Sequence, residues 1–257
     1  MAKSRVDALL VERGLFETRE KARTAVLAGS VFTGDRQLTK PGLLLAADAE
    51  VHVVARARFV SRGGEQLEHA LSTFGLDAAG TVAADLGAST GGFTDCLLQH
   101  GAAHVYAVDV GYGQLDYRLR QDPRVTVLER TNARYLEALP EPLDVATIDV
   151  SFISLTKVLG PLQRLLKPEA NVIALVKPQF EALREEVGRG GVVRDVQARA
   201  RVLGRIVAWS GAHGYRLKGL TRSPLRGPAG NVEFLIHLRW PAGAAAALVA
   251  EPQGSSQ

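Results

Sequence analysis

The stretch DLGASTGGFTD, residues 85–95, decides the fold of this chain. It separates an apolar run from a segment with the composition of a helix, and its glycines, Gly87, Gly91 and Gly92, let the backbone turn sharply and approach a ligand closely. A second apolar run follows and places an acid, Asp109, near its end. A strand, a glycine-rich turn, a helix and a strand that ends in an acid are typical of α/β units that bind nucleosides.

The chain beyond residue 64 continues this alternation of strands and helices. We expect strands at residues 81–86, 104–110, 125–131, 143–150, 171–177, 215–223 and 231–240, and helices at 65–74, 93–101, 153–166 and 196–214. The alternation predicts a doubly wound α/β sheet with parallel core strands. The last two strands are joined by SPLRGPAGN, which has no room for a helix, so the last strand should be antiparallel. This combination is typical of the Rossmann-like class I methyltransferase fold.

The first quarter of the chain differs from the rest in charge. Residues 1–62 hold 11 Lys/Arg and 7 Asp/Glu, a surplus that equals the formal net charge of +4 of the whole chain. Two predicted helices, at 5–15 and 18–29, precede short strands in a segment too small for a large core. A small basic module indicates an anionic polymer as partner, although a solvated basic face explains the charge equally well.

The segment RVDALLVERGLFETREKARTAVLAGSVFTGDRQLTKPG resembles the small α+β RNA-binding domain of ribosomal protein S-four and of pseudouridine synthases. The resemblance implies that basic side chains meet RNA phosphates, namely Arg5, Arg19, Lys21, Arg23, Arg36 and Lys40. We therefore expect an S-four-type RNA-binding domain at residues 1–55, a linker at 56–63, the α/β domain at 64–241 and a disordered tail at 242–257.

The glycine-rich loop also bears on the ligand. A pyrophosphate loop reads G-x-G-x-x-G, whereas this loop reads G-A-S-T-G-G and suits a nucleoside that carries an amino acid. Asp109 can accept both ribose hydroxyls, and Asn132 follows the third strand, where it can address the adenine edge. These features favour S-adenosylmethionine over NAD. The predicted cofactor-binding residues are Asp85, Gly87, Ser89, Thr90, Gly91, Gly92, Phe93, Asp109 and Asn132.

Three charged residues stand at the ends of, or inside, further predicted strands. Asp149 closes LDVATIDV, Lys177 closes NVIALVK and Glu233 lies within NVEFLIHL. Such groups are costly at the edge of a sheet unless they pair with each other or with a ligand. A catalytic cluster and a buried ion pair that locks the sheet both satisfy this requirement.

Several motifs of the chain resemble those of a known family. The motifs SRGGEQLEHAL, DLGASTGGFTD, IDVSFISLTKVL, LVKPQFE and VGRGGVVRD are similar to those of the ribose 2′-O-methyltransferases of the TlyA type, a ribosomal-RNA branch of the FtsJ-like enzymes that is often labelled haemolysin. The resemblance covers residues 1 to about 240. It implies methyl transfer from S-adenosylmethionine to a ribose 2′-hydroxyl, with ribosomal RNA or ribosomal subunits as partner.

The resemblance also implies a catalytic Lys-Asp-Lys-Glu tetrad, of which Asp149, Lys177 and Glu233 match the last three members. Gln66 stands where the family pattern has the first lysine; its amide can orient a hydroxyl but supplies no charge. Arg62, one helical turn earlier, offers a cation, although a guanidinium is a poor base. We expect Arg62 and Arg189 to contact the RNA as well.

Other functions remain open at this level. Gln66 in place of a lysine is compatible with a ribosome-associated RNA-binding factor that has lost catalysis. The family label suggests a membrane-damaging haemolysin. An NAD-dependent oxidoreductase is the most distant alternative. The sequence has no run of about 18 apolar residues and no apolar signal core at its start, so we expect no membrane span. The single cysteine, Cys96, predicts a buried thiol in a cytoplasmic protein, and we expect neither a metal site nor an obligate protein partner.

The charge distribution yields a first prediction. Deletion of residues 1–55 should leave cofactor binding intact, while RNA binding weakens and becomes less salt-sensitive, because fewer phosphate contacts release counterions. Titration of RNA at several salt concentrations measures both effects. A truncated chain that binds RNA as tightly, with the same salt slope, would contradict the assignment of RNA affinity to the basic module.

Overall fold

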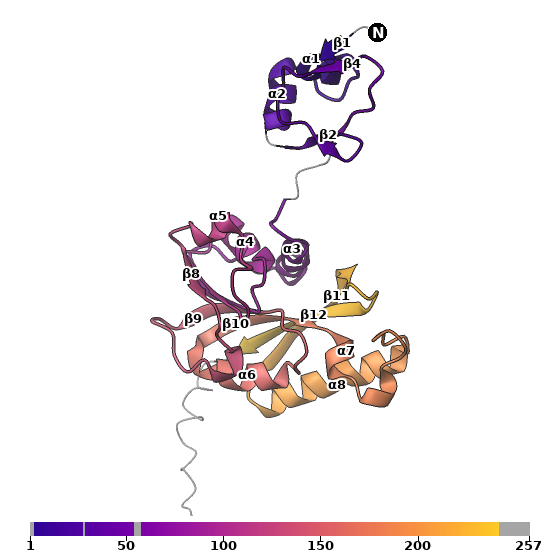
Figure 1. Ribbon diagram of the computed structural model, residues 1–257. Coiled ribbons are helices and arrows are strands. Elements are labelled where there is room, and N and C mark those ends of the chain that lie inside the picture. Colours follow the sequence, from indigo (N-terminus) through magenta and orange to yellow (C-terminus); the bar gives the residue numbers. More distant parts are fainter. Residues whose placement is uncertain (1–2, 28, 54–57, 242–257) are drawn as a thin grey trace, which may run out of the picture. The chain divides into compact units, whose positions relative to one another are not determined.

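The computed structural model describes residues 3–27, 29–53 and 58–241, and the chain divides into two compact units, Met1–Arg58 and Phe59–Gln257 (Figure 1). The division falls inside the segment predicted as a linker, residues 56–63. Phe59 is 3% exposed and packs in a core of the second unit, which therefore begins before the predicted residue 64. The predicted tail at 242–257 lies outside the described residues.

The small unit contains the two predicted helices and two small sheets. Its elements are β1 (Lys3–Arg5), α1 (Val6–Glu12), α2 (Arg19–Leu27), β2 (Val31–Thr33), β3 (Arg36–Gln37), β4 (Leu44–Ala46) and β5 (His52–Val53). Thr18 caps α2, since its hydroxyl accepts a hydrogen bond from the Lys21 N–H at 3.2 Å. Strands β1 and β4, which pair antiparallel, were not predicted, because no turn like Gly34–Asp35, which separates β2 from β3, joins them in the sequence.

A buried carboxylate ties the two helices of the small unit together. Asp7, on α1, accepts hydrogen bonds from Arg5 Nε at 3.0 Å and from Arg5 Nη2 at 2.8 Å, and from Arg19 Nη2, on α2, at 3.2 Å. The hydrogen bond from Arg5 is the main reason why the pKa of Asp7 falls from 3.8 to about 2. Two of the six arginines and lysines predicted to meet RNA, Arg5 and Arg19, therefore share this buried carboxylate.

The second unit is built on one sheet of seven strands, in the order β11-β12-β10-β9-β6-β7-β8. The strands are β6 (Val82–Leu86), β7 (His104–Val108), β8 (Val125–Leu128), β9 (Leu143–Ile148), β10 (Leu166–Val176), β11 (Arg216–Arg226) and β12 (Val232–Trp240). Strands β6 to β10 pair in parallel, whereas β12 runs antiparallel to both β10 and β11. The seven predicted strands and the antiparallel last strand are confirmed.

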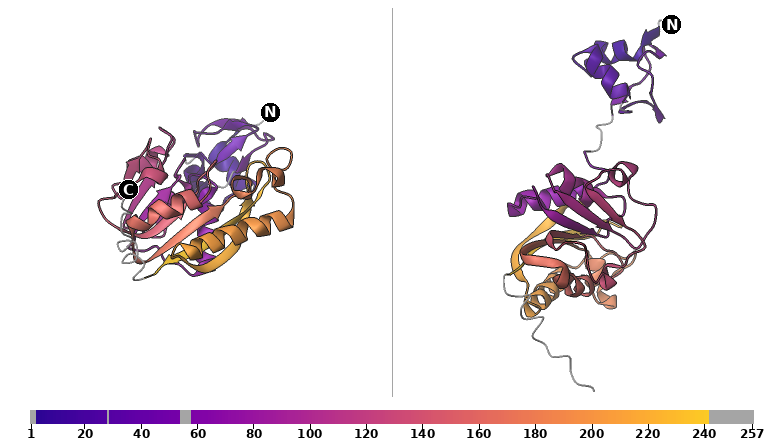
Figure 2. Two further views of the ribbon diagram at one scale, coloured as in Figure 1. Left: turned by 90° about the horizontal axis from the view of Figure 1, so that it is seen from below. Right: turned by 90° about the vertical axis from the view of Figure 1, so that its left-hand side faces the viewer.

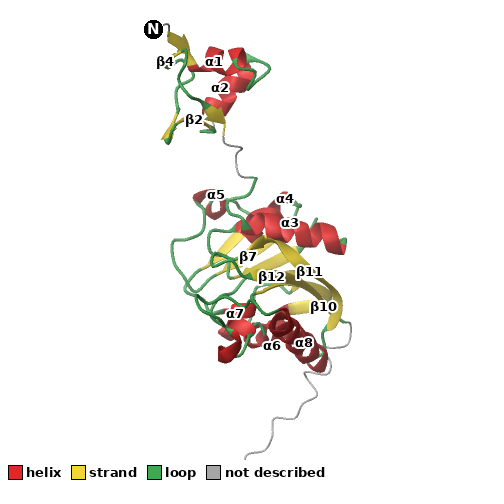
Figure 3. Ribbon diagram, turned by 90° about the vertical axis from the view of Figure 1, so that its right-hand side faces the viewer, coloured by secondary structure: helices red, strands yellow, loops and turns green. Residues whose placement is uncertain are grey.

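Helices cover both faces of this sheet, as Figures 1 and 3 show. One face carries α3 (Gly63–Phe74), α4 (Gly92–Gln99) and α5 (Tyr117–Arg120), and the other carries α6 (Thr156–Leu162), α7 (Pro178–Glu181) and α8 (Val196–Ala212). The two views of Figure 2 show the same layered arrangement from further sides. Each face has its own apolar core: Leu67 and Leu97 are fully buried under α3 and α4, and Leu159 and Val202 under α6 and α8.

Boundaries differ from the prediction mainly before β10. The helix expected at 153–166 is α6 followed by a 3-10 turn, η2 (Gln163–Leu165), and β10 begins at Leu166 instead of residue 171. The polar stretch Lys167–Pro168–Glu169 hides this early start from the hydrophobic pattern, and the register with β9 shifts there. The short helices α5 and α7, and the 3-10 turns η1 (Ala133–Tyr135) and η3 (Arg184–Glu186), were not predicted.

The cluster around Asp7 yields a prediction for the small unit. The Asp7→Asn variant should lose about 1 kcal/mol of local stability, a small value because both arginines are at least half exposed and water screens them. Since the pKa of Asp7 is lowered, this contribution is present above pH 3.8 and is lost as the pH falls towards about 2.

Hydrogen exchange of the α1 and α2 peptides in the full chain measures this effect at neutral pH. Asp35→Asn, which removes an exposed acid of the same unit, is the control. Equal protection in the Asp7→Asn variant and the unaltered chain would show that the ion pairs do not stabilise the unit.

Candidate active site

Two adjoining cavities open where the carboxyl ends of the parallel strands meet. The polar cavity, of about 330 Å³, contains the predicted residues Arg62, Gln66, Asp85, Gly87, Ser89, Thr90, Gly92, Phe93, Asp149, Lys177 and Glu233 in its lining. The apolar-walled cavity, of about 480 Å³, is lined by the predicted residues Asp109 and Asn132 and by apolar side chains of the loop after β9. Gly87, Ser89 and Asp149 line both, so one ligand can occupy the two cavities together.

The loop between β6 and α4 needs its glycines for different reasons. Gly87 has φ +91°, and a Cβ there would lie 2.4 Å from the main-chain oxygen of Asp149. At Gly92 a Cβ would lie 2.9 Å from the Gly64 nitrogen, so this glycine lets the start of α3 approach the loop. These two close approaches shape the polar cavity.

Gly91 lies against apolar side chains. Its φ is +97°, and a Cβ there would meet Leu119 Cδ1 at 2.3 Å and Leu115 Cδ1 at 2.8 Å. Gly91 is not among the residues that line the two cavities. It was predicted as a cofactor-binding residue, but the structure places it under α5.

Asp85 is fully buried at the end of β6. Its carboxyl accepts hydrogen bonds from the Thr94 N–H at 2.9 Å, from the Thr94 hydroxyl at 2.7 Å and from the Thr147 hydroxyl at 3.3 Å. Burial raises the pKa of Asp85 to about 7; the Thr94 hydroxyl opposes this shift and the nearby Asp149 charge adds to it. Asp85 therefore holds the first turn of α4 against β6 while it also lines the polar cavity.

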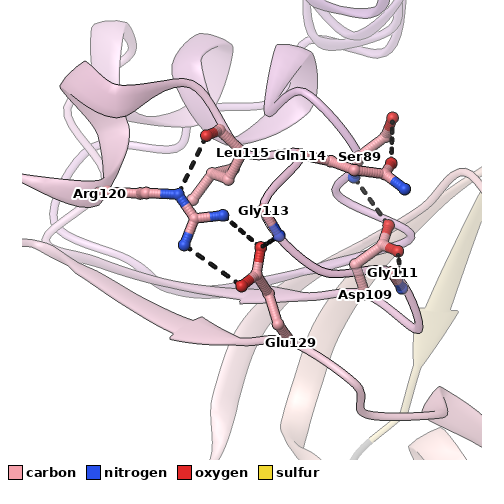
Figure 4. Close-up of polar contacts among 8 residues, drawn as sticks. All are labelled: Ser89, Asp109, Gly111, Gly113, Gln114, Leu115, Arg120 and Glu129. Atoms are coloured by element: carbon pink, nitrogen blue, oxygen red, sulfur yellow. Dashed lines mark hydrogen bonds and ion pairs between the residues drawn. The ribbon is translucent and has the colours of Figure 1, made fainter.

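Asp109 organises the neighbouring loop, as Figure 4 shows. One oxygen accepts a hydrogen bond from the Ser89 N–H at 2.8 Å and the other from the Gly111 N–H at 2.6 Å. An ionised carboxylate has about four acceptor positions, so both oxygens can accept further hydrogen bonds from a diol. The position of Asp109 in the wall of the apolar-walled cavity is compatible with the predicted contact to ribose.

The loop beyond Asp109 is held from its other side. Glu129, which follows β8, forms an ion pair with Arg120 and accepts a hydrogen bond from the Gly113 N–H at 2.8 Å (Figure 4). Arg120 Nε also donates to the Leu115 carbonyl at 3.1 Å. This bracing fixes the segment that covers Asp109 before any ligand arrives.

The remaining walls of the apolar-walled cavity suit a flat ring. Val110, Val150 and Ile153 contribute apolar surface, and Asn132 stands at the start of η1 with its side-chain oxygen accepting the Arg134 N–H at 3.0 Å. Phe152 borders the same cavity with 89% of its surface exposed and φ +64°. A diol acceptor, apolar walls and an amide beside a cavity rich in charge match the two ends of S-adenosylmethionine, a nucleoside and a charged amino acid.

Three predicted tetrad positions form a connected group in the polar cavity. Lys177 Nζ lies 2.6 Å from Asp149 Oδ1 and donates to the Ser151 hydroxyl at 2.9 Å. Glu233, on β12, is 3% exposed, and burial raises the pKa of its carboxyl although the Lys177 charge opposes the shift. The acid, the base and the second acid are thus brought together by three different strand ends.

Gln66 completes this group from α3. Its Nε2 donates to the Glu233 carboxylate at 3.3 Å and to the Ser223 hydroxyl at 2.9 Å. The amide therefore occupies the tetrad position but neutralises no charge on Glu233. Arg62, at the start of the same helix, lines the polar cavity as well.

The predicted RNA-binding residues lie on the surfaces of both units. Arg23, Arg36 and Lys40 are exposed on the small unit, and Lys21 is exposed but forms an ion pair with Glu17. Arg189 is exposed on the loop before α8 and is not among the residues that line the polar cavity.

Sequence reasoning missed several residues of the site. Ser151 directly follows the strand end at Asp149, and that position was a usable signal. Ser223 lies in an exposed basic strand, where nothing in the pattern marks it as a partner of Gln66. Cys96 is fully buried in the core under α4, as predicted.

In the part of the chain that the structure describes, no group of three or more His, Cys, Asp or Glu side chains is placed to hold a metal ion. None of the described helices is long and apolar enough to cross a membrane.

Comparison with known proteins agrees with this geometry. The profile of the FtsJ-like methyltransferases matches residues 59–240. The chain belongs to the FtsJ-like methyltransferase family. S-adenosylmethionine is therefore its cofactor, and the match covers the second unit but not the small one, whose S-four-type character stays a prediction.

Relatives of similar length share most of the chain. The Bacillus subtilis protein named "Putative rRNA methyltransferase YqxC" is 53% identical over 246 residues, which are 93% of this chain and 86% of that one. The 16S/23S rRNA (cytidine-2′-O)-methyltransferase TlyA of Mycobacterium tuberculosis is 46% identical over 92% of this chain and 90% of its own. A solved structure from Streptococcus thermophilus, labelled a hemolysin, is 46% identical with a TM-score of 0.72 and covers 94% of this chain and 90% of its own.

A binding experiment tests the predicted cofactor site of this methyltransferase. The Asp109→Ala variant should bind S-adenosylmethionine more weakly by about 1–3 kcal/mol, because two ribose hydroxyls lose a charged acceptor. Isothermal titration calorimetry measures the loss. Asp109→Asn, which keeps one acceptor oxygen, should lose less, and Asp122→Ala, which removes an acid paired with Arg124 elsewhere on the unit, should lose nothing. Unchanged affinity in the Asp109→Ala variant would place the adenosyl group elsewhere.

Proposed function

We propose that this protein methylates the 2′-hydroxyl of a ribose in ribosomal RNA, with S-adenosylmethionine as methyl donor. The observation that carries the proposal is the group formed by Lys177, Asp149 and Glu233 in a cavity that adjoins the apolar-walled cavity. The names of the two relatives in Bacillus and Mycobacterium, both rRNA methyltransferases, support ribosomal RNA as the substrate. With this substrate, the protein would act on ribosomal subunits or their RNA in the cytoplasm.

The residues of the polar cavity have distinct tasks in this proposal. The cofactor supplies an electrophilic methyl group on a sulfonium. Lys177, held by Asp149 at 2.6 Å and by Ser151 at 2.9 Å, has a fixed position from which its Nζ can hydrogen-bond the 2′-oxygen. As the new C–O bond forms, the bond between the methyl carbon and the sulfur breaks and leaves the sulfur as a neutral thioether. The hydroxyl loses its proton in the same step, and the Lys177–Asp149–Glu233 group takes up that proton. Because a hydroxyl is a weak nucleophile, orientation against the methyl group contributes much of the rate.

Gln66 changes the charge of this group. Counted by formal charge, the two carboxyl groups of Asp149 and Glu233 face one amine, that of Lys177, whereas the lysine of the family pattern would balance them. The raised pKa of Glu233 follows the same logic, since burial penalises a carboxylate that only one nearby lysine compensates. We propose that Arg62, in the lining of the same cavity, supplies the missing positive charge to the substrate.

The small unit has its own proposed part. Arg5 and Arg19 share the buried Asp7, so we assign the main phosphate contacts to the exposed Arg23, Arg36 and Lys40. These residues would hold structured RNA while the second unit acts on one flipped nucleotide.

A second candidate function is favoured by Gln66 alone: an RNA-binding factor that has kept the cofactor site and lost catalysis. One experiment separates the two. Purified protein is incubated with isotopically labelled cofactor and separated ribosomal subunits, and the labelled ribose is mapped. Methyl transfer that is abolished in the Lys177→Ala variant, with cofactor affinity retained, supports the enzyme. RNA binding without transfer in the unaltered chain supports the binding factor.

The tetrad position yields its own prediction. If Arg62 supplies the positive charge, as proposed above, the Arg62→Ala variant should strongly lower the single-turnover rate at saturating cofactor, and Gln66→Lys should change that rate little. A higher rate in Gln66→Lys, with unchanged cofactor affinity, would show instead that the site lacks a cation that Arg62 does not supply. Thermal unfolding must be compared in parallel, since an unpaired buried lysine destabilises a site. Unchanged rates in both variants would show that neither position contributes charge to the reaction.

A further inference from the structure

A third cavity, which no tetrad or cofactor residue explains, lies beside the polar cavity. It has a volume of about 400 Å³ and is formed by the loop that precedes α8, by α8 itself and by the connection between β11 and β12. Three arginines line it, Arg194, Arg199 and Arg226, and we call it the arginine cavity. Its other lining residues are valine, alanine and glycine, and none of them is acidic.

The three arginines differ from two other arginines of α8, Arg201 and Arg205, which form ion pairs. On α8, Arg201 and Arg205 both pair with Glu186, with Arg201 Nε 2.8 Å and Arg205 Nη2 3.7 Å from its carboxylate. Within the described ranges, Arg194, Arg199 and Arg226 form no ion pair. Two of the guanidinium groups donate long hydrogen bonds to main-chain carbonyls, Arg199 Nη2 to Arg194 O at 3.5 Å and Arg226 Nη1 to Gly230 O at 3.4 Å.

The walls of the arginine cavity are fixed by a buried asparagine. Asn231, 1% exposed, accepts a hydrogen bond from the Val193 N–H at 3.0 Å and donates to the Gly191 carbonyl at 2.9 Å. Its own carbonyl accepts the Gly227 N–H at 3.0 Å. The loop with Arg194 and the connection with Arg226 are therefore held together, and the three cations are gathered before a ligand arrives.

The arginine cavity adjoins the reaction site through Arg226, which also lines the polar cavity. A ligand that reaches from one cavity to the other must be anionic at the arginines and must place a hydroxyl at Lys177. Several arginines around one cavity match the several oxygens of a phosphate, which accepts charge-assisted hydrogen bonds.

We infer that the arginine cavity binds a backbone phosphate of the RNA strand next to the nucleotide that is methylated. The inference rests on the proposed function for the identity of the strand, but the phosphate contact itself does not require catalysis. Arg194 and Arg199 bind the phosphate from the α8 side, and Arg226 links this subsite to the polar cavity. The subsite sets how far the target ribose enters the polar cavity, whereas the small unit supplies contacts to more distant RNA.

The test compares arginines of one helix in the full chain. Arg199→Ala removes a cation of the arginine cavity, and Arg205→Ala removes the same charge from α8 at a residue paired with Glu186. The probe is a short fluorescein-labelled single-stranded oligouridylate, followed by anisotropy at several salt concentrations. Arg199→Ala should weaken binding about ten-fold and lower the slope of log affinity against log salt by about 0.7, the value for one phosphate contact on a single strand. Arg205→Ala should change neither.

Two further variants and one assay complete the test. Arg194→Ala, at an exposed position, should repeat the loss, and Arg199→Lys should restore part of the affinity, since it keeps the charge without the planar fork. In the methylation assay, Arg199→Ala should raise KM for ribosomal RNA and leave the affinity for S-adenosylmethionine unchanged.

The outcomes separate the subsite from the proposed function. If Arg199→Ala and Arg205→Ala bind the oligouridylate equally, the arginine cavity is not a phosphate subsite, whether or not the chain methylates RNA. If the unaltered chain methylates no ribosomal RNA, and the Arg194→Ala and Arg199→Ala variants bind the oligouridylate more weakly than the unaltered chain, the proposed function fails and the subsite stands.

Discussion

The close approach of Gly87 to the main-chain carbonyl of Asp149 is the constraint on which the site depends. A side chain at Gly87 would stand 2.4 Å from that oxygen, so only glycine lets the loop after β6 lie against the end of β9. This contact makes Gly87 and Asp149 common walls of the polar and apolar-walled cavities. The same contact bears on the lysine, because Asp149 touches the loop with its main-chain oxygen and pairs with Lys177 through its carboxylate.

The order of strands and the location of the site could be predicted because they follow from strong local patterns. Apolar runs that end in Asp109, Asp149 and Lys177 mark strand ends, and the parallel strands bring those ends to one edge. Short elements were beyond such reasoning. Helix α5 has four residues, and nothing in Tyr117–Arg120 shows that it closes over Gly91.

Individual contacts were harder to predict than positions. Gly91 belongs to the same glycine-rich motif as Gly87 and Gly92, yet it faces Leu115 and Leu119, because direction within a loop depends on a backbone path that a motif does not specify. A charge count over the first quarter of the chain assumes that every arginine is free to contact an anionic partner. Asp7 is buried between Arg5 and Arg19, so part of the basic surplus stabilises the small unit instead of facing a partner.

The position of Cys96 has a practical consequence for the two units of this chain. It is the single cysteine of the sequence and is fully buried in the core under α4, where thiol reagents have no access in the folded state. An exposed cysteine introduced into each unit would therefore take up fluorescent labels without interference from the native thiol. The distance between the labels, followed by energy transfer in the presence and absence of RNA, would report whether the separation of the units changes when RNA binds.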